Sequence, residues 1–191
     1  DGYEPGSTFK TITMAAAIEE GTTTLNDSFY CSGSEMFAER GNTPLHCWQH
    51  AGHGSETTFQ ELQKSCNIAF AHIGLKLGGE KFYEYAKAFG LLEATGVGMS
   101  GESDGIFFPK STITDPNANG YGAAVIAGSF GQTFKVTPIQ LVRAISAVVN
   151  GGYVMQPYIV SEVLDGDGNV VQKNEPTVIR QAISEETSEI M

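Results

Sequence analysis

The stretch DGYEPGSTFK, residues 1–10, passes through a Pro-Gly turn into the text STFKTITMAAAIEEG. Apolar side chains recur there at helical spacing, which predicts a helix over about 7–20. Between Ser7 and Ile18 the only charged residue is Lys10. The positive end of the helix macrodipole favours acidic residues at this position, so the lysine needs an explanation beyond helix formation.

Ser7 and Lys10 stand three residues apart and face the same way from the first helical turn. If that turn is partly buried, desolvation and the macrodipole lower the pKa of the lysine towards neutrality. A neutral lysine can take the proton of the serine, and free backbone N–H groups of the turn can hold an oxyanion. The spacing is common by chance, so an ordinary serine near a helix start with a solvated lysine remains the alternative.

The composition narrows the class of protein. A chain of 191 residues with 41% hydrophobic content suits one globular domain, or one domain with part of another. The net charge of -11, from 11 basic and 22 acidic residues, opposes binding to nucleic acid or to an anionic membrane surface. No apolar run reaches membrane-spanning length, and we expect the missing targeting segment to reflect truncation.

The chain reads as mainly helical, without repeats or a linker between domains. The tripeptide Ser65-Cys66-Asn67 falls at the junction of two helical segments and supplies a hydroxyl and a carboxamide. The serine could relay a proton, and the asparagine could orient the lysine or contact a substrate amide; a helix cap is the alternative.

The chain divides into four predicted parts. They are a nucleophile helix at about 7–20, a Cys/His-containing loop at 21–56, a helical core at 57–150, and a β-hairpin and following segment at 151–191. Within the helical core, the pattern at 121–131 does not distinguish a helix from a strand.

Three sequence motifs resemble those of a known family: YEPGSTFK at 3–10, SCN at 65–67 and SFGQTFKVTPIQLVRA at 129–144. Together with the glycine-rich passage at 90–105, they resemble the transpeptidase domain of class B penicillin-binding proteins over essentially the whole chain. The resemblance implies the helical subdomain of the α/β fold shared by penicillin-binding proteins and β-lactamases. It would be mainly α with a peripheral β-hairpin, with most of the central sheet outside this chain.

The resemblance also implies roles for four residues. Ser7 would be the acyl-forming nucleophile, Lys10 its general base, Ser65 a proton relay and Asn67 a contact to substrate and lysine. The activity would be that of a peptidoglycan D,D-transpeptidase that needs no cofactor and is acylated by β-lactams. Its partners would be peptidoglycan stem peptides, the remainder of the transpeptidase domain and a glycosyltransferase. It would stand at the extracytoplasmic face of the bacterial membrane, anchored by a segment outside these 191 residues.

One family motif is not in this chain. None of the lysines after Ser65 begins a Lys-Thr-Gly or Lys-Ser-Gly triplet, and we expect that edge strand to follow residue 191 in the full-length protein. The excised chain alone should therefore acylate poorly. A β-lactam-sensing or β-lactam-hydrolysing relative and a noncatalytic cell-wall scaffold remain alternatives, although Asn67 argues against the class D relatives, whose second motif usually ends in Val or Ile.

A cysteine and histidine cluster lies between the two motifs. Three interpretations stay open: a structural Zn2+ site, a disulfide between Cys31 and Cys47, and small buried thiols. Some relatives look alike around Cys31, Cys47 and His53, which favours those three as a unit. His50 is the preferred fourth ligand, ahead of His46 and Cys66.

Overall fold

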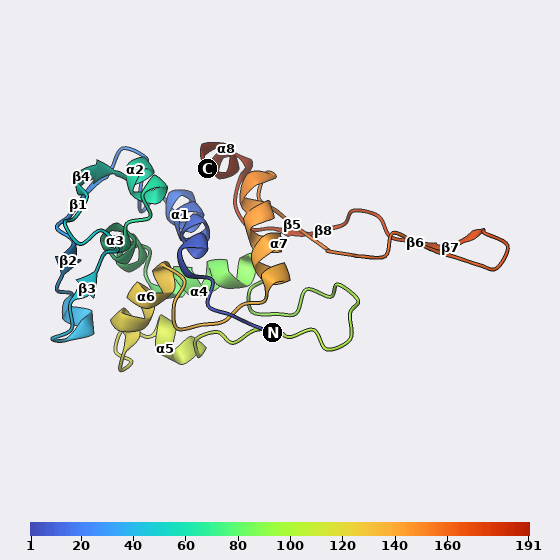
Figure 1. Ribbon diagram of the computed structural model, residues 1–191, viewed down its shortest axis with the longest axis horizontal. Helices are drawn as coiled ribbons and strands as arrows, with labels where there is room; N and C mark the ends of the chain where they lie inside the picture. The colour runs from blue at the N-terminus through green and yellow to red at the C-terminus, as the bar shows by residue number, and fades with distance from the viewer.

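The computed structural model describes all of residues 1–191, and its body is built from helices (Figure 1). None of the helices is long and apolar enough to cross a membrane. The helices are η1 (Gly6–Phe9) and η2 (Ala38–Arg40), both of the 3-10 type, and α1 (Lys10–Glu19), α2 (Thr58–Gln63), α3 (Asn67–Leu77), α4 (Gly79–Ala88), α5 (Lys110–Thr114), α6 (Tyr121–Ser129), α7 (Pro138–Val149) and α8 (Glu185–Ile190).

The strands form four separate antiparallel pairs rather than a central sheet. This matches the expected helical subdomain with a peripheral hairpin. Two of the pairs lie in the segment predicted as a Cys/His-containing loop, with the last strand ending at Thr57, and the other two follow α7. The pairs are β1 (Ser28–Cys31) with β4 (Gly54–Thr57), β2 (Ser34–Glu35) with β3 (Leu45–His46), β5 (Tyr153–Met155) with β8 (Val178–Gln181), and β6 (Glu162–Leu164) with β7 (Val170–Lys173).

Helix α1 lies inside the body, between α3 on one side and α7 on the other (Figure 1). Its alanines Ala15 to Ala17 are almost completely buried, and small side chains of this kind let neighbouring helices approach closely. The ambiguous segment at 121–131 is helix α6, which packs on α3. A Cβ placed on Gly74 of α3 would lie 2.5 Å from the Cβ of Ser129, so this contact depends on the absence of a side chain.

The predicted β-hairpin projects away from the helical body as the ribbon β6–β7 (Figure 1). Every residue of both strands is exposed. Its turn is closed by the Asp165 carboxylate, which accepts hydrogen bonds from the backbone N–H groups of Asp167 at 2.9 Å and Asn169 at 2.8 Å. The acidic residues here therefore serve the turn, as the Asp-Gly-Asp-Gly-Asn sequence predicts.

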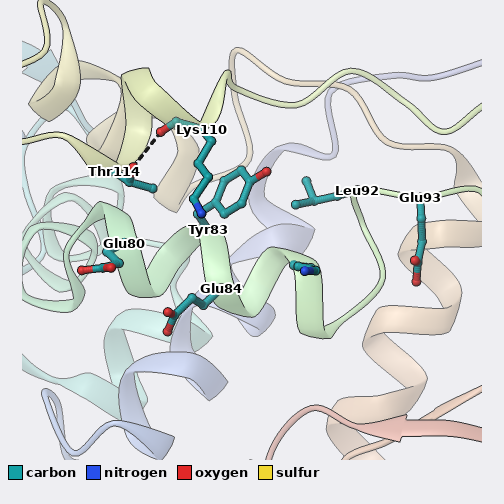
Figure 2. Close-up of a pocket in the computed structure, with 8 residues that line it drawn as sticks. Glu80, Tyr83, Glu84, Leu92, Glu93, Lys110 and Thr114 are labelled. Atoms are coloured by element: carbon teal, nitrogen blue, oxygen red, sulfur yellow. Dashed lines mark hydrogen bonds between the residues drawn. The ribbon is translucent and has the colours of Figure 1, made fainter.

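A surface pocket lies between α4 and the short helix α5 (Figure 2). Its lining is mostly charged, with Lys110 placed 5.9 Å from the ring centre of Tyr83. None of the predicted catalytic or metal-binding residues contributes to it. The predicted chemistry lies elsewhere in the molecule, at the start of α1.

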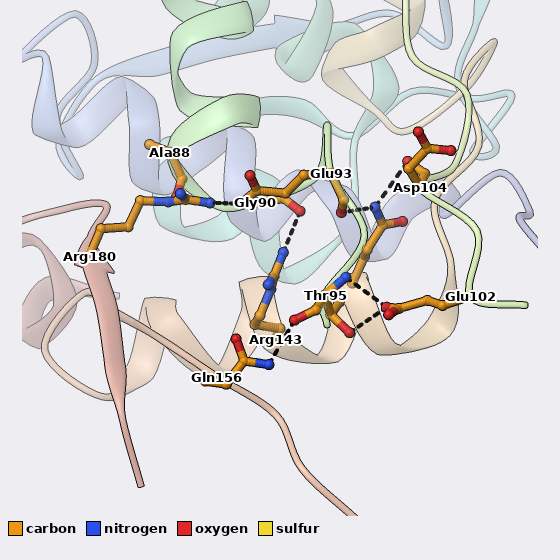
Figure 3. A network of polar contacts seen from close by, with 10 residues as sticks. Ala88, Gly90, Glu93, Thr95, Glu102, Asp104, Arg143, Gln156 and Arg180 are labelled. Carbon is orange, nitrogen blue, oxygen red and sulfur yellow. Dashed lines mark hydrogen bonds and ion pairs between the residues drawn. The ribbon is translucent and has the colours of Figure 1, made fainter. Parts of the chain in front are cut away.

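The glycine-rich passage at 90–105 is held to α7 by polar side chains (Figure 3). Thr137 and Gln140 form a capping box at the start of α7, and Gln140 Nε2 also donates to the carbonyls of Glu93 at 2.8 Å and Asp104 at 3.1 Å. One turn further on, the buried Arg143 donates from Nη2 to the Gly90 carbonyl at 2.6 Å. Side chains of α7 thus supply donors to a loop whose own backbone makes few regular hydrogen bonds.

Candidate active site

The predicted nucleophile Ser7 is exposed in η1, one turn before α1 proper begins at Lys10. Gly6 adopts a φ of 56°, and its N–H donates to the Gly131 carbonyl at 2.9 Å. A Cβ on Gly131 would come within 2.1 Å of the Gly6 carbonyl oxygen, so only glycine fits there. The SFGQ segment therefore packs directly against the turn that presents Ser7.

Lys10 is almost completely buried, with 1% of its surface exposed, and its ammonium points at the second predicted motif. Lys10 Nζ donates to the Ser65 carbonyl at 2.8 Å, to Ser65 Oγ at 3.0 Å and to Asn67 Oδ1 at 2.7 Å. The Phe70 ring centre lies 5.3 Å from the same nitrogen. The structure thus brings Lys10, Ser65 and Asn67 together across more than fifty residues of sequence.

Burial lowers the pKa of Lys10 from 10.5 to about 8, and the nearby Cys66, Cys47 and Glu61 oppose this shift. An ammonium has three N–H donors, and all three have acceptors here. Release of one proton would leave a nitrogen lone pair within hydrogen-bonding distance of the Ser65 hydroxyl. The arrangement can therefore hold a proton and give it up near neutral pH, as a general base requires.

Ser65 adopts a left-handed conformation with φ 56°, which is uncommon for a residue other than glycine. The conformation is held by the chain on both sides. The Ser65 N–H donates to the Leu62 carbonyl at 3.1 Å, and the Cys66 N–H donates to the Glu61 carbonyl at 3.0 Å. This turn between α2 and α3 aims both the carbonyl and the hydroxyl of Ser65 at Lys10, which is the kind of backbone strain found at functional sites.

The cysteine and histidine cluster lies directly behind this turn. Cys31, Cys47, Cys66 and His53 place their ligand atoms within 4.8 Å of one another, and the three cysteines are free thiols. His50, the predicted fourth ligand, is not in this group, and Cys66 takes its place. Cys66 lies in this group because α3 begins at Asn67, and the start of this helix brings Cys66 to the two cysteines of the preceding loop.

The four side chains fit a tetrahedral zinc ion. Zinc–sulfur bonds of about 2.3 Å separate two sulfur ligands by about 3.8 Å. Cys47 Sγ lies 3.9 Å from Cys66 Sγ and 3.9 Å from His53 Nδ1. Burial alone would raise the pKa of Cys47, but the backbone N–H groups of Asn67 and Gln49 outweigh it and lower that pKa. The loop and the start of α3 therefore make Cys47 more acidic than an ordinary thiol, which favours metal binding because the thiolate is the form that binds a metal.

Two acidic residues of this region were not expected from the sequence. Glu61 in α2 and Glu56 in β4 are both buried, and they form a group with His53 whose ligand atoms lie within 4.8 Å of one another. Their signal in the sequence was weak. Glu61 stands three residues after Thr58, which is also buried, so the two share the inner face of α2.

The arrangement of helices around α1 is that of the helical subdomain of a transpeptidase fold. Residues 1–191 match the penicillin binding protein transpeptidase domain. The chain therefore belongs to the family of penicillin-binding protein transpeptidase domains.

Two curated relatives and one solved structure illustrate the similarity. Stage V sporulation protein D of Bacillus subtilis is 44% identical over 188 residues, which are 97% of this chain and 28% of that protein. The peptidoglycan D,D-transpeptidase PbpA of Mycolicibacterium smegmatis is 31% identical, over 95% of this chain and 36% of that protein. A ceftriaxone acyl-enzyme complex of penicillin-binding protein A from Mycobacterium tuberculosis superposes with a TM-score of 0.86 at 26% identity, covering 98% of this chain and 41% of that one. The chain thus spans well under half the length of each.

Proposed function

We propose that the protein containing this chain is a serine-type peptidoglycan D,D-transpeptidase and that Ser7 is its acyl-forming nucleophile. The observation that carries the proposal is the buried Lys10, hydrogen-bonded to Ser65 and Asn67 and with its pKa lowered to about 8. A buried lysine of this kind is costly for a structural role and useful for proton transfer. The relative named as a D,D-transpeptidase and the solved acyl-enzyme complex support the same assignment.

The proposed acylation begins when neutral Lys10 takes the proton from Ser7 Oγ. The oxygen attacks the carbonyl of a D-Ala-D-Ala amide, and backbone N–H groups at the start of η1 and α1 can help to hold the developing oxyanion. The proton passes through the Ser65 hydroxyl, which already contacts Lys10, to the nitrogen of the departing D-Ala. Attack by an amine of a second stem peptide on the acyl-serine then forms the cross-link and restores the Ser7 hydroxyl.

The substrates in this proposal are peptidoglycan stem peptides, and β-lactams occupy the same site by acylating Ser7. In this proposal the protein works at the extracytoplasmic face of the bacterial membrane, where peptidoglycan lies, and a glycosyltransferase is its proposed partner in wall synthesis. Turnover of the adduct separates this function from β-lactam hydrolysis. A transpeptidase retains the acyl group that a β-lactam leaves on its serine, whereas a hydrolysing relative releases that group in each catalytic cycle.

Intact-mass measurement of the full-length protein incubated with a penicillin tests the assignment. We expect one adduct with the full mass of the drug, because a β-lactam ring opens without losing atoms. The Ser7→Ala variant should carry none, and the matched variant Ser55→Ala, which changes an exposed serine of β4, should acylate like the wild type. A full-size adduct that persists in Ser7→Ala would refute the assignment of Ser7.

We also propose a structural Zn2+ held by Cys31, Cys47, His53 and Cys66. The support is the clustering of four zinc-type ligand atoms in buried or half-buried positions. With four protein ligands the ion would have no open position for a substrate, so it would stabilise the loop at 21–56 and take no part in bond making. Metal analysis combined with thiol titration of the native protein tests it. Three reactive thiols and no bound metal would exclude the ion.

A further inference from the structure

The imidazole of His53 is partnered on one side only. Its Nδ1 lies 3.9 Å from Cys47 Sγ, within the group of sulfur atoms described above. Its other nitrogen, Nε2, is buried and has no hydrogen-bond partner. A buried ring nitrogen without a partner costs free energy, so a neighbouring group that accepts a hydrogen bond from its N–H would stabilise the fold.

Two carboxylates lie close to this ring. Ligand atoms of His53, Glu56 and Glu61 are within 4.8 Å of one another. Glu56 has one oxygen engaged, because Lys64 donates to its Oε1, and its Oε2 is buried without a partner. Glu61 has 0% of its surface exposed, and neither of its oxygens accepts a hydrogen bond from a nitrogen or oxygen donor. Both carboxylates can thus accept a hydrogen bond from His53, but Glu56 already has a lysine partner, whereas both oxygens of Glu61 are free.

We propose that Glu61 is a positioning residue that accepts the Nε2–H of His53 and so keeps the lone pair of Nδ1 directed at the metal ion. The inference rests on the proposed zinc site and extends it to a carboxylate outside the four ligands. A metal-bound histidine usually donates its second ring N–H to a carboxylate or carbonyl, which sets the tautomer and the orientation of the ring.

The position of Glu61 also connects this pairing to the catalytic turn. Its backbone carbonyl accepts the Cys66 N–H at 3.0 Å, and Cys66 stands between Ser65 and Asn67. One residue of α2 thus supports the proposed metal site through its side chain and the Ser65 turn through its backbone. Substitution of the side chain leaves the backbone contact in place, so the two roles can be tested separately.

The test uses the full-length protein and measures Zn2+ affinity by competition with a chelator. Glu61→Leu removes the acceptor, and we expect its affinity to fall by about 10- to 100-fold, the usual effect of losing such a partner. Glu61→Gln keeps a carbonyl acceptor and should recover part of that loss. Gln63→Leu makes a similar polar-to-leucine change at an exposed position of the same helix and should bind Zn2+ like the wild type. Unchanged affinity in Glu61→Leu would overturn the proposal.

A second measurement does not depend on the variant folding. In wild-type protein labelled with 15N-histidine and loaded with Zn2+, we expect the His53 signal to report metal bound through Nδ1 and a proton on Nε2. Metal bound through Nε2 would overturn the role of Glu61 while leaving the zinc site intact. A wild-type protein that binds no Zn2+ would remove the zinc site and this inference together. Neither result would bear on the assignment of Ser7 as the nucleophile, which the mass measurement tests independently.

Discussion

Lys10 Nζ lies 2.7 Å from Asn67 Oδ1, the shortest of its three hydrogen bonds. The two residues come from the first turns of different helices, α1 and α3, whose N-termini therefore meet at this contact. Two positive helix ends and a desolvated site all disfavour an ammonium, and the amide and serine oxygens compensate only in part. The balance leaves a lysine that can lose its proton near neutral pH.

The rate of acylation should rise with pH through about 8, because the active form of Lys10 is the neutral amine. Second-order rate constants for a chromogenic cephalosporin, measured from pH 6 to 9.5, would show this. The free energy of unfolding should also depend on pH, because Lys10 has a lower pKa in the folded chain than in the unfolded chain. Between pH 8 and 10.5 the unfolded chain binds more protons at Lys10 than the folded chain does, so this contribution to stability rises with pH across that window. A flat rate profile across pH 8 would contradict the assignment of Lys10 as the base.

Asn67→Leu and Asn67→Asp should move the pH profile of acylation in opposite directions. Leucine removes an acceptor from the ammonium, which lowers the pKa of Lys10 further and costs about 1.5–3 kcal/mol of stability. Aspartate keeps an acceptor and adds a negative charge, which raises that pKa and moves the profile to higher pH. Rate profiles and urea unfolding of both variants provide the measurement. Identical midpoints in the two variants would show that Asn67 does not act on Lys10.

Gly131→Ala should slow acylation and destabilise the protein by about 1–3 kcal/mol. The new Cβ would meet the Gly6 carbonyl oxygen at 2.1 Å and push the SFGQ segment away from the turn of Ser7. Gly98→Ala is the matched control, since Gly98 has a similar φ, 83° against 78°, and open space around its Cβ position. The control carries the backbone strain alone, so equal acylation rates in the two variants would argue against the steric explanation.

Arg143→Met should destabilise the protein by about 1.5–3 kcal/mol, the usual cost of losing a hydrogen bond to a charged group. Its guanidinium donates to the Gly90 carbonyl and fills the space that a Cβ on Gly90 would occupy. Urea unfolding measures the loss. Lys173→Met, on the exposed hairpin, removes a positive charge without a buried partner and should change stability little. Comparable losses in both variants would assign the effect to net charge.

Removal of the proposed zinc ion by a chelator should slow acylation of Ser7 and lower the melting temperature, and added Zn2+ should restore both. The reason is the position of Cys66 between Ser65 and Asn67, so that the ion and Lys10 hold opposite sides of one short turn. Stopped-flow acylation before and after chelation would measure the effect. If the protein loses its zinc and still acylates at the original rate, the ion supports only the loop at 21–56 and not the Ser65 turn.

The order and type of most helices could be predicted from the spacing of apolar residues and from caps such as Thr137 and Ser184. Segments with little periodicity were harder. The small-residue stretch of α6 is hydrophobic on all sides, so its pattern could not distinguish a buried helix from a strand. The strands β5 and β8 were not expected, because each is short and gains its hydrogen bonds from a partner more than twenty residues away.

The sequence by itself determined the chemistry that is available: a serine and a lysine one turn apart, a Ser-Cys-Asn turn, and a loop rich in thiols and imidazoles. Only the tertiary structure decided which of these groups meet. It brings Lys10 into contact with Ser65 and Asn67, places Cys66 rather than His50 beside Cys31, Cys47 and His53, and buries Glu61 close to His53. Local spacing sets which way a side chain leaves its own helix, whereas contact between α1, α2 and α3 depends on how their buried faces pack, which a motif does not encode.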